Sequence, residues 1–330
     1  MNKTITRRRF VGLSVATGAT ILAGGRILGS TVRAGLALIA PGTATNPVFK
    51  IGGDLEVNRL GFGAMRLTGE GIWGWPPDRA NAVKVLKRAV ELGVNLIDTA
   101  DAYGPETDEL LIAEALHPYP NGLVIATKGG STRPGPGQWV PNGHPDYLKQ
   151  AVEKSLKRLQ LERIDLYQLH RVDPKVPMEE SLGALKEMQS AGKIRHVGLS
   201  EVSTSEIERA RKVLPIVSIQ NRYNINDRKW EKELDYCERE NLGFLPWFPV
   251  GGGRGVKSTT LDAVAKAHNA SVYQVALAWL LQRSPVMLPI PGTSNIQHLD
   301  DNVAAEKLKL TPEEFSRLSG QTKQEVGINK

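Results

Sequence analysis

The sequence predicts an α/β protein: a closed (β/α)8 barrel, a TIM barrel, with an N-terminal β-hairpin. From about residue 60 onward, short apolar segments alternate with longer segments whose apolar residues recur at helical spacing. Eight apolar segments fit this alternation, and parallel strands joined by helices in this number typically close into a barrel. No linker or fixed-period repeat interrupts the body of the chain, so we expect one domain.

The elements follow in order along the chain. Two short segments flank Gly52 and Gly53, which predicts the hairpin. Apolar periodicity predicts helices at residues 78–93, 106–116, 146–160, 178–192, 203–214 and 229–241. The eight strands are predicted at residues 60–65, 95–98, 123–127, 164–170, 196–200, 217–220, 243–247 and 286–292.

A doubly wound open sheet is the alternative architecture. Its cofactor-binding form usually carries a Gly-x-Gly-x-x-Gly turn after the first strand. Gly61 and Gly63 lack the third glycine of that pattern, and no phosphate-binding loop of the P-loop type appears. The barrel is therefore the preferred prediction.

Charge and cysteine content exclude several classes of protein. The 330-residue chain has a formal charge of +7, but residues 1–40 hold six basic side chains and no acidic one. The rest is nearly neutral, which argues against a nucleic-acid-binding surface. Cys237 is the only cysteine, so no intramolecular disulfide can form, and we expect a half-buried thiol. The histidines show no helical metal-binding spacing, so no metal is predicted.

Residues 1–45 are predicted to be a leader, and residues 46–330 the barrel domain. Arginines at positions 7–9 precede a weakly apolar run over residues 11–25, which is too short to span a membrane. This segment resembles a twin-arginine export signal. The resemblance implies the twin-arginine translocation machinery as a partner and a periplasmic location. The alternatives are a cytoplasmic protein with a basic tail, or anchoring in the inner membrane by an uncleaved leader.

Four polar residues stand at or just beyond the ends of three successive predicted strands: Asp98, Tyr103, Lys128 and His170. The carboxyl ends of barrel strands carry the functional site. Each residue alone has an ordinary structural explanation, but the four together predict a site. A phenol has a pKa of about 10, and a nearby ammonium group lowers it. Lys128 is thus predicted to lower the pKa of Tyr103, while Asp98 holds Lys128 in place.

His170 would orient a substrate oxygen through a hydrogen bond. None of these side chains can supply a hydride, so a reduction would require a nicotinamide.

From about residue 46 to residue 328 the chain resembles the aldo-keto reductases. The motifs that carry the resemblance are GFGAMRL, GVNLIDTADAYG, VIATKGG, DLYQLH, GKIRHVGLSE, SIQNRYN and PIPGTSNIQHLDDN, in this order. The resemblance implies NADPH bound in an extended form and reduction of a carbonyl group. It also implies a catalytic tetrad of Asp98, Tyr103, Lys128 and His170, with Tyr103 as general acid. The segment RLTGEGIWGWPPDR is similar to the pyridoxal-reductase-like branch.

The resemblance also implies cofactor contacts. Ser200 and Gln220 would bind the carboxamide, and Trp247 would stack on the nicotinamide in place of the more common tyrosine. Asn302 would reach the adenine, and the segments PVGGG and PGTSN would hold the phosphates and ribose. The full predicted set is Ser200, Gln220, Trp247, Gly251, Gly292, Thr293, His298 and Asn302.

Three positions depart from the family pattern. Glu201 stands where asparagine is common, Gly292 where lysine is common, and His298 where an arginine often grips the 2'-phosphate. An imidazole is mostly neutral at pH 7, so it is a weak replacement for arginine. The loss of both cations argues for a weaker preference for NADP over NAD. NADP remains the cofactor that the resemblance implies, with NAD as the alternative.

The predicted substrate is a small carbonyl compound. Trp73, Trp75 and Trp139 are candidates for the wall of an apolar pocket that suits an aromatic or aliphatic aldehyde, or for packing within a surface loop. A non-catalytic barrel that binds the nicotinamide as a redox sensor or regulatory subunit is the alternative function. The intact tetrad favours the enzyme.

Overall fold

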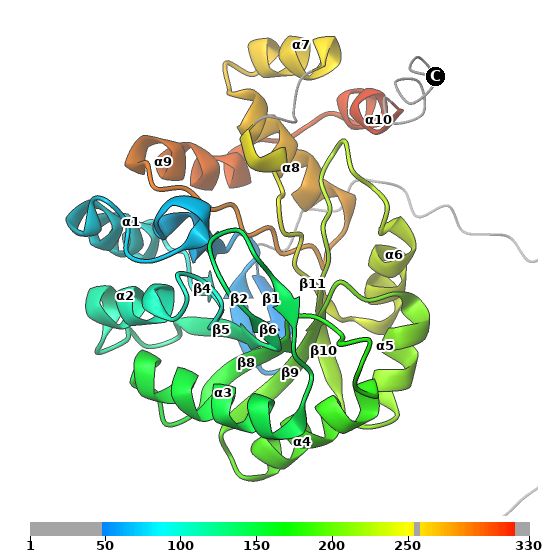
Figure 1. The fold of residues 1–330 in the computed structure, drawn as a ribbon. Coiled ribbons are helices and arrows are strands. Elements are labelled where there is room, and N and C mark those ends of the chain that lie inside the picture. Colours follow the sequence, from blue (N-terminus) through cyan, green and yellow to red (C-terminus); the bar gives the residue numbers. More distant parts are fainter. Residues whose placement is uncertain (1–47, 254–257, 321–330) are drawn as a thin grey trace, which may run out of the picture. The chain divides into compact units, whose positions relative to one another are not determined.

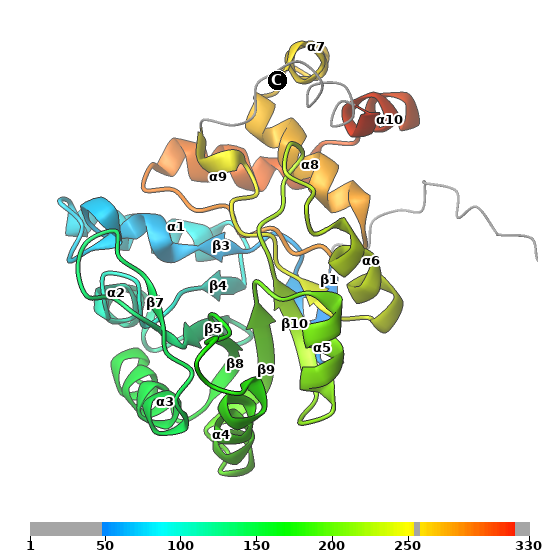
Figure 2. The same ribbon diagram turned by 45° about the vertical axis from the view of Figure 1, so that its right-hand side comes forward.

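The computed structural model describes residues 48–253 and 258–320, so the predicted leader lies outside the described residues. Parallel strands curl into a barrel with helices around it (Figures 1 and 2), which confirms the predicted fold class. In sheet order the strands are β3 (Phe62–Gly63), β4 (Leu96–Asp98), β5 (Val124–Gly129), β8 (Ile164–Leu169), β9 (Ile194–Ser200), β10 (Ile216–Gln220) and β11 (Gly243–Phe244).

The eighth predicted strand, residues 286–292, closes the barrel without a regular ladder. On one side it exchanges two backbone hydrogen bonds, of 2.8 and 2.9 Å, with Phe244 of β11. On the other side the carbonyls of Pro289 and Pro291 accept hydrogen bonds from Gly61 and Gly63. A proline has no N–H, so neither residue can donate back to β3. The two prolines therefore explain why this segment does not pair as a full strand.

The predicted hairpin consists of β1 (Val48–Ile51) and β2 (Leu55–Asn58), paired antiparallel. Its turn residues Gly52 and Gly53 have φ angles of +65° and +87°, which favour glycine. A Cβ on Gly52 would lie 2.6 Å from the ring of His196, near the start of β9. The hairpin thus packs against the amino-terminal end of the barrel.

The six predicted helices are all present. The start of α1 is capped by Asp78, whose carboxylate accepts from the N–H of Asn81, and α5 begins with a capping box of Ser203 and Glu206. Cys237 in α6 is fully buried rather than half-buried. The bounds are α1 (Arg79–Glu91), α2 (Thr107–Leu116), α3 (Pro145–Leu159), α4 (Met178–Ser190), α5 (Thr204–Arg211) and α6 (Glu231–Glu240).

Four further helices were not predicted: α7 (Thr259–Ala267), α8 (Val272–Arg283), α9 (Ile296–Ala304) and α10 (Pro312–Gly320). In α8 every residue from Val275 to Leu281 is buried, so this segment has no amphipathic period. The remaining elements are a second hairpin, β6 (Ser131–Thr132) and β7 (Val140–Pro141), and the 3-10 turns η1 (Ala64–Leu67), η2 (Glu70–Ile72), η3 (Gly251–Gly253) and η4 (Ala305–Lys307). Within the described residues, no helix is both long enough and apolar enough to cross a membrane.

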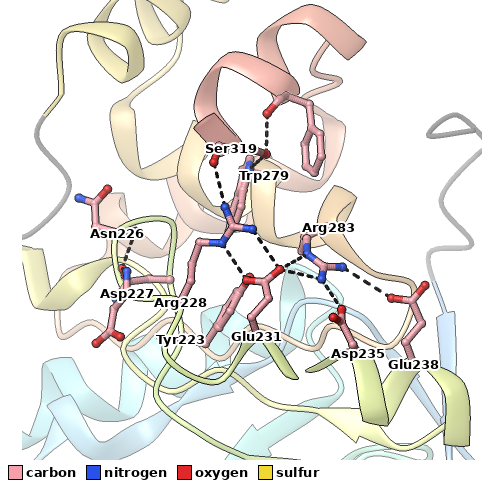
Figure 3. A network of polar contacts seen from close by, with 12 residues as sticks. Tyr223, Asn226, Asp227, Arg228, Glu231, Asp235, Glu238, Trp279, Arg283 and Ser319 are labelled. Carbon is pink, nitrogen blue, oxygen red and sulfur yellow. Dashed lines mark hydrogen bonds and ion pairs between the residues drawn. The ribbon is translucent and has the colours of Figure 1, made fainter. Parts of the chain in front are cut away.

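A charged network joins α6, α8 and α10 (Figure 3). The Glu231 carboxylate accepts hydrogen bonds from the Tyr223 hydroxyl at 2.6 Å and from the Nε atoms of Arg228 and Arg283 at 2.8 Å. Arg228 also donates to the carbonyl of Ser319 in α10, at 2.9 Å. These bonds connect the last helix to the barrel.

Candidate active site

The predicted catalytic residues converge at the carboxyl ends of β4, β5 and β8. Asp98, Tyr103 and His170 line a cavity of about 460 Å³, and Lys128 is buried beside Asp98 and Tyr103. The parallel order β4–β5–β8 places these strand ends next to one another. The structure thus brings together four residues that lie between positions 98 and 170 of the sequence.

The Lys128 ammonium group is the centre of the arrangement. Its Nζ lies 2.6 Å from Asp98 Oδ1 and 2.8 Å from the carbonyl of Thr99, and donates to both. It also lies 3.3 Å from the Tyr103 hydroxyl. Burial alone would lower the pKa of Lys128, but the charge of Asp98 and the hydrogen bonds to Asp98 and Tyr103 raise it above its ordinary value. Lys128 is therefore held as a cation against the phenol.

The pKa of Tyr103 differs from the sequence-based prediction. Burial raises it, and this effect outweighs the lowering by Lys128, so the net pKa lies above the ordinary value. The predicted lysine effect is present but smaller than the desolvation of the phenolate. Tyr103 is consequently a neutral hydroxyl donor at neutral pH, as a general acid must be before it transfers its proton.

His170 is a neutral imidazole. Burial lowers its pKa well below the ordinary value, and the charges of Lys128, Arg171 and Arg133 lower it further. Its ring lies 5.8 Å from the Tyr103 ring between centroids, at 84°. Its Nδ1 atom is buried and has no hydrogen-bond partner within the described residues. A neutral imidazole beside the phenol can donate a hydrogen bond to a substrate oxygen without adding charge.

Half of the predicted cofactor residues line the same cavity: Ser200, Gln220, Trp247 and Gly292. Gln220 Nε2 donates to Asp98 Oδ2 at 2.8 Å, so this side chain also supports the tetrad. The other four do not line the cavity: Gly251, Thr293, His298 and Asn302. Thr293 directly follows Gly292, and His298 and Asn302 lie further along the chain, in α9.

Glu201 and Trp247 form a pair that the sequence did not reveal. Trp247 Nε1 donates to Glu201 Oε1 at 2.7 Å, and the same oxygen accepts from the backbone N–H of Arg222 at 2.7 Å. Glu201 also adopts a left-handed backbone, with φ of +57°. The two departures from the family pattern, Glu201 and Trp247, are therefore coupled. The indole N–H, which stands where the family more often has a phenol, donates to the glutamate.

Gly292 has a steric reason to be glycine. A Cβ at this position would lie 2.3 Å from the carbonyl oxygen of Gly63. The backbone on this side of the cavity is thus too close for a lysine side chain without a local shift.

Of the three candidate tryptophans, only Trp139 lines the cavity. Trp75 is 38% exposed and lies under the guanidinium of Arg79, 3.7 Å from its ring centroid. Trp73 has Arg133 5.7 Å from its ring and also lies outside the cavity lining. For Trp73 and Trp75 the second alternative holds: both lie outside the cavity lining and contact neighbouring arginines in the surface loop.

Two arginines in the cavity lining were missed. Arg66 lies in the GFGAMRL motif, with its guanidinium 5.8 Å from the Phe248 ring, and Arg171 directly follows His170. Arg171 donates to the Ser200 hydroxyl at 3.1 Å. Neither arginine has an ion pair within the described part of the chain. Two uncompensated cations, close-approaching glycines and a fixed indole fit an anionic dinucleotide with a flat ring.

Comparisons with known proteins identify the family of the chain. The profile of the Aldo/keto reductase family matches residues 59–321. The chain belongs to this family.

An uncharacterised oxidoreductase of Schizosaccharomyces pombe is 52% identical over 274 residues, which cover 83% of this chain and 89% of the relative. Pyridoxine 4-dehydrogenase of Escherichia coli is 45% identical and covers 81% of this chain and 96% of its own. An aldo-keto reductase from Klebsiella pneumoniae, solved in complex with NADPH, has a TM-score of 0.71 at 25% identity. The match covers 83% of this chain and 94% of that protein's chain. Glycerol dehydrogenase from Gluconobacter oxydans has a TM-score of 0.77 at 27% identity. The match covers 86% of this chain and 97% of the dehydrogenase chain.

This aldo-keto reductase is an NAD(P)H-dependent oxidoreductase that acts on carbonyl groups. The redox-sensor alternative is not favoured.

Proposed function

We propose that this aldo-keto reductase reduces an aromatic aldehyde to an alcohol, with Tyr103 as the general acid. The observation that supports this best is the buried Lys128 ammonium, which binds Asp98 and contacts the Tyr103 hydroxyl beside the cavity. A bound nicotinamide supplies the hydride. The residues of the chain supply the proton and hold the carbonyl.

In this proposal the carbonyl oxygen of the substrate accepts hydrogen bonds from the Tyr103 hydroxyl and the neutral His170 ring. As negative charge develops on that oxygen, Tyr103 transfers its proton to it. The Lys128 ammonium stabilises the phenolate that remains, and Asp98 keeps Lys128 in position. Ser200, Gln220 and Trp247 are proposed to hold the nicotinamide ring over the same cavity. The proposed remainder of the cofactor path is Gly251, Gly292, Thr293, His298 and Asn302.

Two observations support an aromatic substrate of the pyridoxal type. The relative at 45% identity is named pyridoxine 4-dehydrogenase. The aromatic side chains of Tyr103, Trp139 and Trp247 all line the cavity. To test this, purified protein is mixed with NADPH and a panel containing pyridoxal, benzaldehyde and propanal, and the loss of NADPH absorbance is followed. Sustained turnover, fastest with the aromatic members, supports the proposal; binding of NADPH without turnover contradicts it.

NADP is the proposed cofactor. Aldo-keto reductases of similar fold have been solved with NADPH or NADP bound. Arg66 and Arg171 supply positive charge to the cavity lining, which suits the phosphates of either nicotinamide dinucleotide. Calorimetric titration with both cofactors measures the preference. Tighter binding of NADH would overturn this part of the proposal.

Export through the twin-arginine machinery, and a periplasmic location, are proposed for residues 1–45. The arginines at positions 7–9 and the weakly apolar run after them support this. Because the cofactor is made in the cytoplasm, the enzyme would fold and bind it there, and then cross the inner membrane folded. Replacing Arg7 and Arg8 with lysine should leave active enzyme in the cytoplasm on fractionation. A wild-type protein that is wholly cytosolic with its leader intact would mean that the segment is only a tail.

A further inference from the structure

Trp139 reaches the active-site cavity from the loop between β6 and β7, residues 133–139, and is the residue of this loop that lines it. The guanidinium carbon of Arg133 lies 3.7 Å from the ring centroid of Trp139, at the opposite end of this loop. At this separation the guanidinium lies directly against the indole. Trp139 is 38% exposed, and it is the tryptophan of this region that lines the cavity.

Arg133 is itself held by backbone carbonyls from three segments of the chain. Its Nε donates to Gln138 at 2.7 Å, and its terminal nitrogens donate to Ala102, Gly71 and Ile72 at 2.8, 2.9 and 3.0 Å. No carboxylate pairs with it in the described part of the chain. The planar fork of arginine suits this arrangement, because its donors point in fixed directions within one plane.

The geometry around Trp139 connects this contact to the tetrad. The Trp139 ring lies 6.2 Å from Tyr103 and 5.9 Å from His170 between centroids, with interplanar angles of 80° and 72°. An exposed tryptophan without such support would occupy several rotamers, and a substrate would have to order it on binding. Here the Arg133 guanidinium lies against the indole and limits the space for other rotamers.

We propose that Arg133 is a specificity-determining residue that acts through Trp139. It holds the indole as a fixed aromatic wall beside Tyr103 and His170, and thereby selects flat, conjugated carbonyl substrates over short aliphatic aldehydes. Arg133 is a positioning residue in this role, since the substrate contacts Trp139. The inference rests on the proposed carbonyl reduction.

The chain offers a matched control. Arg79 lies against Trp75 at the same separation of 3.7 Å, outside the cavity lining. Arg79→Lys disturbs the same kind of contact at a place where no substrate selection is expected.

The experiment measures KM and kcat with benzaldehyde and with propanal for the wild type, Arg133→Lys, Trp139→Leu, the double variant and Arg79→Lys. Arg133→Lys keeps the charge but loses the planar fork, so KM for benzaldehyde should rise about tenfold, which corresponds to a cation–π contact plus lost ordering. KM for propanal should change less than about twofold. NADPH affinity, measured by calorimetry, should be unchanged, and Arg79→Lys should match the wild type throughout.

The double variant tests whether Arg133 acts through Trp139. If it does, Arg133→Lys adds nothing to the loss already caused by Trp139→Leu, whereas independent roles give additive losses. Equal rises in KM for both aldehydes, or additive losses, would overturn the inference. Should Arg133→Lys fail to fold by circular dichroism, Trp139→Leu keeps all four carbonyl contacts of Arg133 and must still lose the aromatic preference.

Failure of the proposed function would look different. In that case the wild type would reduce neither aldehyde with NADPH. If the wild type reduces both aldehydes, the variants test only the inference about Arg133.

Discussion

The structure has two charged networks, one around Glu231 in α6 and one around Lys128 at the strand ends. They differ in how completely their polar groups are paired. In the Glu231 network (Figure 3) the carboxylate has three donors, and Arg283 also pairs with Asp235 at 2.5 Å. Burial alone would raise the pKa of Glu231, but hydrogen bonds from Arg228 and Tyr223 and the charge of Arg283 lower it to about 2. In this network the charged groups are paired with one another, and the pairs connect α6, α8 and α10.

The tetrad of Asp98, Tyr103, Lys128 and His170 also has a charged group at its centre, the Lys128 ammonium, but part of the tetrad faces a cavity. Lys128 uses its three donors within the protein, yet Tyr103 and His170 face a cavity. Burial raises the pKa of Tyr103 and lowers that of His170, so both are neutral groups held in a poorly solvated place. A closed network contributes mainly to stability, whereas an open one keeps hydrogen-bonding capacity for a substrate.

The largest expected effect is on turnover. Tyr103→Phe removes the proton donor but keeps the ring, so kcat should fall by about 10²-fold or more. Thermal stability and NADPH affinity should remain near the wild-type values, because Lys128 keeps its two shorter contacts. Steady-state kinetics and calorimetry measure both. Tyr119→Phe, which removes a half-buried tyrosine hydroxyl away from the cavity, is the control and should keep full activity. Near-normal turnover of Tyr103→Phe would remove this residue from its role.

The reverse pattern is expected for Glu231→Gln. The pKa of Glu231 falls from 4.5 to about 2 on folding, so its contribution is present above pH 4.5 and is lost as pH falls toward 2. The side chain is 27% exposed, and we expect a loss of about 2 kcal/mol in the free energy of unfolding at pH 7. Urea denaturation at several pH values measures this.

The kcat of Glu231→Gln should stay within about twofold of the wild type. Glu179→Gln, which breaks an exposed pair with Arg209, should leave stability almost unchanged. A stability loss in Glu231→Gln that persists unchanged in strong acid would contradict the linkage.

Asp101, just after β4, is an intermediate case. Tyr147 donates to one of its oxygens at 3.3 Å, but the other is buried without a partner among the described residues. Burial, then the charge of Glu109, raises its pKa to about 8. The folded state thus keeps a proton that the unfolded state releases near pH 4, so this group makes folding less favourable as pH rises from about 4 to 8.

Asp101→Asn removes this titration. Its unfolding free energy should match the wild type near pH 4 and exceed it by at least about 1 kcal/mol at pH 8. Chemical denaturation at both pH values is the measurement. A variant less stable than the wild type at pH 8 would show that Asp101 is ionised and paired in the folded protein.

The smallest expected effect concerns cofactor affinity. Arg66 lies between Phe248 and Gly292 at the cavity lining and has no ion pair in the described residues. If it meets the pyrophosphate common to both cofactors, Arg66→Gln should weaken NADPH and NADH equally, by about threefold for one exposed charge contact. Arg79→Gln is the control in the same calorimetric titrations. Weakening of NADPH alone would instead place Arg66 at the 2'-phosphate.

The sequence-based predictions were most accurate where the structure depends on residues close together in the sequence. The helices α1 and α3 to α6 were predictable because each has a local apolar period and, for α1 and α5, a local cap. The fully buried α8 was not, since its pattern depends on packing from all sides. The predicted strands 60–65 and 243–247 have only two regular strand residues each. Residues 64 and 65 belong to η1, whereas Leu245 and Trp247 still donate backbone hydrogen bonds to Ile219 and Asn221 beyond the end of β11.

At the candidate site the sequence indicated which four residues come together, but not their electrostatics. Asp98, Tyr103, Lys128 and His170 each sit at a strand end that a short motif marks. The direction of the Tyr103 pKa shift was predicted wrongly, because the desolvation by surrounding strands exceeds the effect of the one neighbouring charge.

The sequence by itself determined the order of strands and helices and the chemical groups at the strand ends, because both are written in local patterns and barrel topology brings those ends together. Only the tertiary structure decided which side chains act on one another. The contacts of Trp247 with Glu201 and of Gly292 with Gly63 join residues far apart in the chain. Their distances depend on how the whole barrel closes, and desolvation and hydrogen bonding depend on those distances.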